Sequence, residues 1–171
     1  MYLFYLIQRK NPEKYHVVIS DVFNDYSTPY HLSTLEFNRL VKSHMKKDGI
    51  YLINVNDYEY SKYTPSFIHT LKQVFNYVYL FNVDEKWKKE ADGTPVITSL
   101  DRIIVATDRN INLRDYMRFI TKNGTVKPSG YPLSSKELRE YLDQRKPLLL
   151  TDNYAPTDIL LAPIFKQNLK E

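Results

Sequence analysis

The stretch of residues 15–37 constrains the fold of this chain more than any other, because a short apolar run within it stops abruptly at an acid. The run VVI at 17–19 consists of β-branched residues, which is typical of a strand buried on both faces. A loop rich in turn residues follows, and a helical pattern begins near Thr34. Ligands of open α/β sheets bind beyond the carboxyl ends of the strands, so we expect Asp21 and Asp25 to face such a crevice.

Two further strands alternate with helices downstream of this stretch. Helical patterns are found at 34–47 and 65–76, and apolar strands are predicted at 50–55 and 77–83. The order strand, helix, strand, helix, strand indicates parallel pairing with right-handed crossovers. The run RIIVA at 102–106 follows its predecessor without an intervening helix, so it is predicted to form an antiparallel edge hairpin with it.

The two ends of the chain carry weaker patterns. Residues 2–8, YLFYLIQ, form an apolar helix or strand with no polar lead-in, which is a first indication that the chain is part of a larger domain. Near the other end, a helix is predicted at 113–120 and a turn-rich link at 127–132. Ser134 and Glu137 then have the spacing of a capping box, which opens another helix.

The composition is that of an ordinary globular protein. Hydrophobic residues make up 43% and charged residues 26%, and 171 residues suffice for one domain with a sizeable core. We therefore predict a single domain over residues 1–171, in which 111–171 form a helical C-terminal extension. No apolar run is long enough to span a bilayer and nothing points to secretion, so we expect a cytoplasmic protein with no membrane segment in this chain.

Several classes of function are disfavoured by what the sequence lacks. The chain has no cysteine, which excludes disulfides, thiolate catalysis and cysteine-bound metals. Its four histidines have no metal-binding spacing, so no metal is expected. The net charge is +4, but the basic residues are scattered among acids, which disfavours nucleic acid as a partner. With only four glycines there is no glycine-rich nucleotide fingerprint, so the cofactor-binding residues stay unknown.

Asp21 and Asp25 are the strongest candidates for a functional pair. Two neighbouring carboxylates can hold a cationic amine, act as a general base or bind a divalent cation. An equally good interpretation is that they only stabilise the turn through hydrogen bonds to loop amides. Beside them, Tyr26 and Tyr30 offer hydroxyls, and His31 is the one histidine that lies in a loop rather than in or beside a core element.

Four segments of the chain together resemble the C-terminal half of spermidine synthase-like proteins, the polyamine aminopropyltransferases. They read VVISDVFNDYSTPYHLSTLEF, LVKSHMKKDGIYLINVND, DRIIVATDR and LLTDNYAP, and the resemblance extends over residues 11–165. The motifs DVFNDYS and LTDNYAP are specific in combination. The resemblance is greatest to the long forms, in which this domain follows membrane helices. Taken alone, the segment at 151–156 either packs over a site or closes the edge of the fold.

The resemblance implies a Rossmann-like fold of the methyltransferase type, with helices on both faces of the sheet. It also implies transfer of an aminopropyl group from decarboxylated S-adenosylmethionine, a co-substrate, to a diamine such as putrescine. Asp21 then corresponds to the catalytic acid that deprotonates the attacking amine. Asp25 corresponds to the acid that holds the charge of the diamine, at a spacing one residue longer than the usual D-x-x-D. Tyr26, Tyr30 and His31 are expected to contribute to substrate binding.

The chain departs from this family in one respect. The family's glycine-rich loop and ribose-binding acid precede the matched region and have no counterpart in these residues. We therefore expect half of a cofactor site, an inactive isolated chain, and a bare strand edge that favours a homo-oligomer. A non-catalytic α/β module and an S-adenosylmethionine-dependent methyltransferase stay open as alternatives. In a longer parent protein, the domain would lie at the cytoplasmic face of a membrane.

Overall fold

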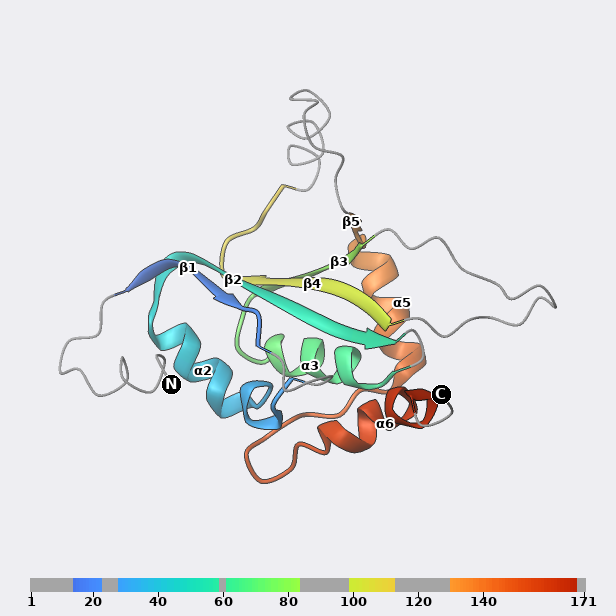
Figure 1. Cartoon of the computed structure of the whole chain (residues 1–171). Coiled ribbons are helices and arrows are strands. Elements are labelled where there is room, and N and C mark those ends of the chain that lie inside the picture. Colours follow the sequence, from blue (N-terminus) through green and yellow to red (C-terminus); the bar gives the residue numbers. More distant parts are fainter. Residues whose placement is uncertain (1–13, 23–27, 59–60, 84–98, 113–129, 169–171) are drawn as a thin grey trace.

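A five-stranded mixed sheet lies at the centre of the computed structural model, which describes residues 14–22, 28–58, 61–83, 99–112 and 130–168 (Figure 1). The strand order is β1-β2-β4-β3-β5. The strands are β1 (Tyr15–Ser20), β2 (Met45–Tyr58), β3 (Tyr77–Val83), β4 (Ser99–Thr107) and β5 (Gly130–Pro132). The helices are η1 (Tyr30–Leu32, a 3-10 turn), α2 (Leu35–Ser43), α3 (Tyr63–Leu71), α5 (Ser135–Arg145) and α6 (Thr157–Asn168).

The parallel unit predicted from the first stretch is present. Strand β1 pairs in parallel with β2, and α2 connects them. The hydroxyl of Thr34 caps α2 by accepting a hydrogen bond from the Phe37 amide at 3.3 Å. The helix ends at Ser43, earlier than its apolar pattern indicates, because the chain turns at once into β2 and the register with β1 shifts between Tyr15 and Val17.

Backbone atoms crowd Gly49, in the turn that leads into β2. A side chain at this position would meet the carbonyl oxygen of Lys46 at 2.9 Å and that of Tyr15 at 3.1 Å. Real Cβ atoms essentially never come as close as the 2.9 Å to Lys46, and the 3.1 Å to Tyr15 is tighter than most, so a side chain at Gly49 would force the backbone of this turn to shift. The carbonyl of Gly49 also accepts a hydrogen bond from the Thr107 hydroxyl at 2.9 Å, which joins β2 to β4.

The predicted antiparallel pair is formed by β3 and β4, but β4 is not an edge strand of the sheet. Strand β4 lies between β2 and β3 and is antiparallel to both. Consequently β2 and β3 run in the same direction but do not pair with each other, so the predicted parallel pairing is confirmed for β1 and β2 and wrong for β2 and β3. The turn-rich link ends in the short strand β5, which pairs with β3 and forms the edge of the sheet.

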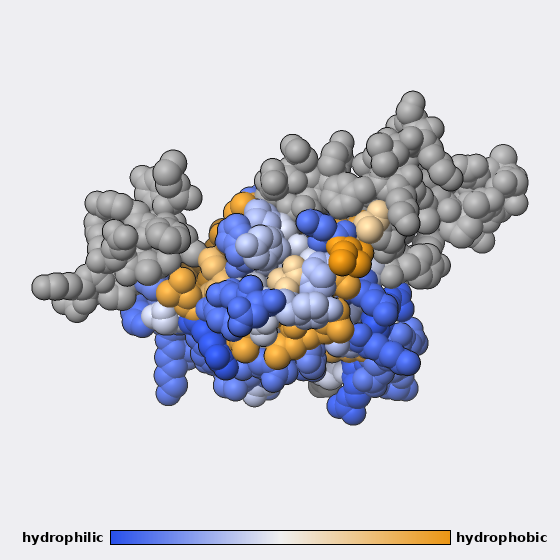
Figure 2. Space-filling model, turned by 90° about the horizontal axis from the view of Figure 1, so that it is seen from below, coloured by the Kyte–Doolittle hydropathy of each residue, from blue (hydrophilic) through white to orange (hydrophobic). Residues whose placement is uncertain are grey.

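One face of the sheet carries the hydrophobic core. Alternate residues of β2 point to this face, and so do their partners on β4 and β3; these include Tyr51, Ile53, Val55, Ile104 and Leu80. Helix α3 is buried along almost its whole length and packs in the same cluster as residues of α5 and α6. Figure 1 shows α2, α3 and α6 beneath the sheet. Seen from below, this helical side is largely hydrophilic, with an apolar band across it (Figure 2).

The α/β fold class is confirmed, and the helices that the structure describes cover this one face. The predicted segments at 2–8, a helix or strand, and at 113–120, a helix, lie outside the described residues. The capping box is confirmed: the Ser134 hydroxyl accepts from the Glu137 amide at 3.3 Å and the Glu137 carboxylate accepts from the Ser134 amide at 2.7 Å. These hydrogen bonds lower the pKa of Glu137. Within the described ranges, no helix is long and apolar enough to cross a membrane.

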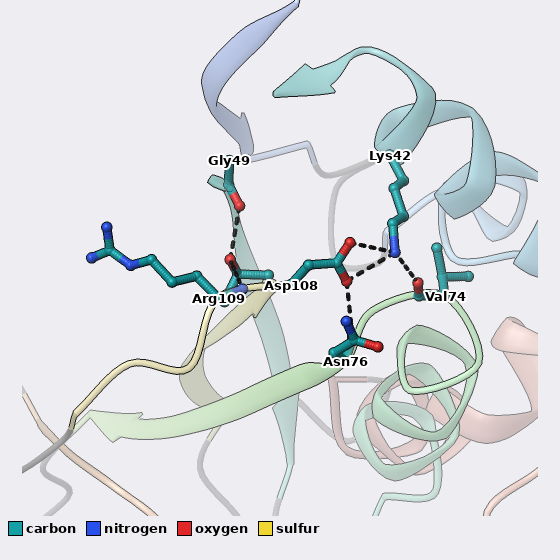
Figure 3. Close-up of polar contacts among 7 residues, drawn as sticks. Lys42, Gly49, Val74, Asn76, Asp108 and Arg109 are labelled. Atoms are coloured by element: carbon teal, nitrogen blue, oxygen red, sulfur yellow. Dashed lines mark hydrogen bonds and ion pairs between the residues drawn. The ribbon is translucent and has the colours of Figure 1, made fainter. Parts of the chain in front are cut away.

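A partly buried ion pair connects α2 to the ends of two other elements (Figure 3). The Lys42 ammonium lies 2.7 Å from the Asp108 carboxylate and donates to the Val74 carbonyl at 2.6 Å. Asp108 also accepts a hydrogen bond from the Asn76 amide at 3.0 Å. The ammonium sits 5.2 Å from the ring centroid of Phe75. The pair therefore holds the end of α2, the turn between α3 and β3, and the end of β4 together.

Replacing Asp108 with alanine should lower the free energy of unfolding by roughly 1–3 kcal/mol, because the Lys42 charge and the Asn76 amide lose their shared acceptor. Urea unfolding followed by circular dichroism measures this change. The matched control is Glu140→Ala, which removes an exposed contact to Lys136 at 3.8 Å and should change stability very little. Equal losses in the two variants would contradict the role assigned to Asp108.

Candidate functional site

The carboxylate of Asp21 lies just beyond the carboxyl end of β1, beside β2, which continues to Tyr58. The last paired residues of β1 and β2 are Ser20 and Ile53, so the residues that follow them are neighbours. The side-chain amide of Asn54 donates a hydrogen bond to Oδ1 of Asp21 at 3.0 Å. Asp21 is exposed, whereas the amide oxygen of Asn54 is buried and has no partner in the described part of the structure. The arrangement is a solvent-facing, oriented carboxylate, which can attract a cation or accept a proton.

The loop after β1 presents two aromatic rings to solvent. Tyr30 and His31 belong to η1 and pack edge to face, with ring centroids 5.5 Å apart. Both are exposed, Tyr30 by 55%. The loop is held by the Ser33 hydroxyl, which donates to the Tyr30 carbonyl at 2.8 Å, and by the Thr34 hydroxyl, which donates to the His31 carbonyl at 3.1 Å. No contact among the described residues joins either ring to Asp21.

Two of the predicted site residues, Asp25 and Tyr26, lie outside the described residues. Their proposed roles therefore rest on the sequence alone. Of the five predicted site residues, the structure describes Asp21, Tyr30 and His31, and it places the first at the end of a strand and the other two on the helical turn that precedes α2.

Tyr63 is buried beside Thr28 and Ser33, and the sequence did not mark it as a site residue. It is the first residue of α3 and is fully buried. Its phenol lies beside the hydroxyls of Thr28 and Ser33; burial raises its pKa, and these two hydroxyls act in the opposite direction. The contacts do not reach good hydrogen-bond geometry, so the Tyr63 and Thr28 oxygens stay buried without a proper partner. A buried tyrosine next to a loop has no distinctive sequence signal.

Asp57 is the second acid at this end of the sheet, but it points into the core. It is fully buried and accepts hydrogen bonds from the amide of Thr64, at 3.0 Å, and from the Thr64 hydroxyl. It therefore stabilises the first turn of α3. Asp57 thus has a structural role, in contrast to Asn54 on the same strand.

Buried Arg102 donates to the Tyr141 hydroxyl at 2.6 Å, and the pKa of Tyr141 is raised mainly by its burial.

The segment at 151–156 packs against the first turn of α2. The Leu35 amide donates to the Leu150 carbonyl at 2.8 Å, and the Asp152 amide donates to the Glu36 carboxylate at 2.9 Å. A two-way bridge between Thr151 and Tyr154 shapes the turn. The motif LTDNYAP at 150–156 is thereby joined to the start of α2, which lies at the end of the first segment of the family resemblance, whereas residues 23–27 of the motif DVFNDYS lie outside the described residues.

Metal ligation finds no support in the described part of the chain, where no three His, Cys, Asp or Glu side chains are grouped closely enough to hold an ion.

Comparisons with known proteins show similarity in fold only. No protein-family profile matches the chain, and no curated protein matches its sequence. A probable spermidine synthase from Corynebacterium glutamicum superposes on 84% of the chain with a TM-score of 0.62 at 16% sequence identity. The chain covers 50% of that protein, so it spans half the length of this related structure.

Two further solved structures match with lower scores. Spermidine synthase from Thermotoga maritima has a TM-score of 0.44 at 14% identity, over 82% of this chain and 43% of its own. A spermidine synthase in complex with the transition state analogue AdoDATO has a TM-score of 0.43 at 15% identity, over 82% of this chain and 42% of its own. The superposition on the Corynebacterium structure establishes the Rossmann-like α/β fold of spermidine synthases for this chain.

The burial of Tyr51, on the strand next to β1, makes the free energy of unfolding depend on pH. It is buried on β2, and burial raises its pKa from 10.0 to about 12, against the opposing effect of the Ser20 hydroxyl. The unfolded chain therefore ionises this phenol first, and the contribution to stability, complete below pH 10, is lost as the pH rises towards 12. In urea unfolding over this range, Tyr51→Phe should reduce the fall in stability with pH. An unchanged slope would contradict the assignment.

Proposed function

We propose that this chain carries the amine-binding side of a spermidine synthase-like site and that Asp21 is its general base. The observation that carries the proposal is the hydrogen bond from Asn54 to the exposed Asp21 carboxylate, at 3.0 Å, just beyond the carboxyl end of β1, where its parallel pairing with β2 stops. Carboxyl ends of strands are the ligand-binding edge of open α/β sheets. The shared fold with a probable spermidine synthase supports the same reading.

The chemistry of aminopropyl transfer requires a carboxylate in this position. An alkyl diamine such as putrescine is protonated near neutral pH, and a protonated amine cannot attack. A carboxylate both attracts the ammonium and accepts one of its protons, which frees the nitrogen lone pair to attack the aminopropyl carbon of decarboxylated S-adenosylmethionine. The new carbon–nitrogen bond forms while the carbon–sulfur bond breaks, and the electron pair of the broken bond leaves with the sulfur of methylthioadenosine. In the proposed site, the proton goes to Asp21.

Asn54 acts in this site as a positioning residue. Its amide occupies Oδ1 of Asp21, which leaves Oδ2 as the oxygen for the amine. Because the Asn54 side chain is partly buried and stands on a paired strand, it restricts the rotation of the carboxylate. A general base that is already oriented loses less conformational freedom when the substrate binds.

The remaining substrate contacts are assigned through the family resemblance. Asp25 holds the second ammonium of the diamine, and Tyr26 contributes a hydroxyl. Tyr30 and His31 stand exposed on η1, where their rings can contact a ligand that reaches Asp21 along the loop. The chain would correspond to the C-terminal half of the catalytic domain, as in the long forms that follow membrane helices.

Diamine binding tests this proposal directly. In an NMR titration with putrescine, amide resonances at Asp21 and Asn54 should shift, and Asp21→Asn should weaken binding at least about tenfold because the paired charge is lost. The matched control is Asp48→Asn, which removes the same charge from an exposed position near the start of β2.

The two variants separate specific from general attraction. Equally weakened putrescine binding in Asp21→Asn and Asp48→Asn would show that putrescine responds only to the overall charge of the protein. An absence of binding by the unmodified chain would favour a non-catalytic α/β module. Asn54→Leu keeps every charge and should weaken binding less than Asp21→Asn, since it removes the orientation of the carboxylate but not its attraction for the amine.

A further inference from the structure

Strand β1 has one unpaired edge. It stands at the end of the sheet, and among the described residues β2 is its sole neighbour. Parallel strands are normally covered on both faces, yet Val17 is 49% exposed and Ile19 is 68% exposed. Both side chains lie on the sheet face opposite the core, since their partners Ile50 and Leu52 alternate with the buried residues of β2. An apolar, unpaired strand edge is a template for pairing with another chain.

We propose that β1 pairs antiparallel with β1 of a second copy of this chain, so that two sheets join into one around a twofold axis. The charges at the strand ends favour this direction. Lys14 precedes the strand and Asp21 follows it, and neither forms an ion pair within the described part of the structure; the Lys14 ammonium donates to the Ser43 carbonyl. Antiparallel pairing brings each Lys14 near the opposite Asp21, whereas parallel pairing would align like charges.

The side-chain pattern selects one register. A twofold axis perpendicular to the sheet keeps each face on the same side, so Val17 must oppose a residue of its own face. Centred on Val18, the pairing sets Val17 against Ile19 of the second copy, twice over, and so brings the exposed apolar side chains into cross-strand contact. Centred on Ile19 instead, it would set Val17 against Asp21.

The proposed contact between the two β1 strands is small, and its size determines how tightly the two copies are expected to associate. A six-residue strand pairs over a small area, so the dimer should form reversibly and depend on protein concentration. The dimer itself does not require the proposed function, because its test contains no diamine.

Sedimentation velocity over a range of protein concentrations tests the association. The unmodified chain should form a dimer, and Ile19→Lys should weaken it at least about tenfold by placing a charge in the apolar pair. The control is Ile159→Lys, the same change at a residue of α6 that is 74% exposed, and it should leave the dimer intact. A monomer at every concentration, or equal effects of the two variants, would overturn the proposal.

The absence of natural cysteine allows the register to be tested as well. In Val18→Cys the two thiols face each other across the axis, at a Cβ separation of roughly 4.5–5.5 Å, which permits disulfide formation after a small adjustment. In His16→Cys the two thiols are offset by four residues, roughly 13 Å along the strand. On a non-reducing gel, oxidised Val18→Cys should run as a dimer and His16→Cys as a monomer. Equal cross-linking, or none in either variant, would overturn this register.

Discussion

The burial of α3 against the inner face of the sheet is the constraint on which the rest of the structure depends. This helix is enclosed almost completely, so its polar side chains need partners inside the protein. The Thr64 hydroxyl pairs with Asp57 at the end of β2. The hydroxyls of Ser66 and Thr70 each accept a backbone hydrogen bond at 3.0 Å, from Leu148 and Leu150. One buried helix thereby fixes a strand end and the segment that leads to α6.

The candidate site is a consequence of this arrangement. Tyr63 is buried beside Thr28 and Ser33, and Leu150, which is fixed by α3, in turn holds the first turn of α2. The exposed Asp21 carboxylate follows β1, and Asn54 of β2 is its hydrogen-bond partner among the described residues. Precise positioning of a small polar group on elements held by a packed core is what general acid–base chemistry needs.

Asp21 could be predicted as a site residue from the sequence, whereas its partner could not. An acid just beyond a β-branched run marks the end of a strand, and this signal is local. The contact with Asn54 depends on the parallel register of β1 and β2, which joins residues far apart in the chain. The sequence shows a polar cluster at the end of β2, but which member faces the site is decided by the alternation of the strand: Asn54 faces outward and Asp57 enters the core.

The sequence by itself determined the α/β class, the β1-α2-β2 unit, the antiparallel β3–β4 pair and the capping box at Ser134, because apolar periodicity and caps are properties of neighbouring residues. Only the tertiary structure decided that β4 lies between β2 and β3, that 151–156 rests on α2, and that Val17 and Ile19 form an open edge. Strand order and burial arise from long-range packing, which no local pattern encodes. The apolar run of β1 predicted a strand buried on both faces, and this prediction is wrong for one face, where Val17 and Ile19 are exposed.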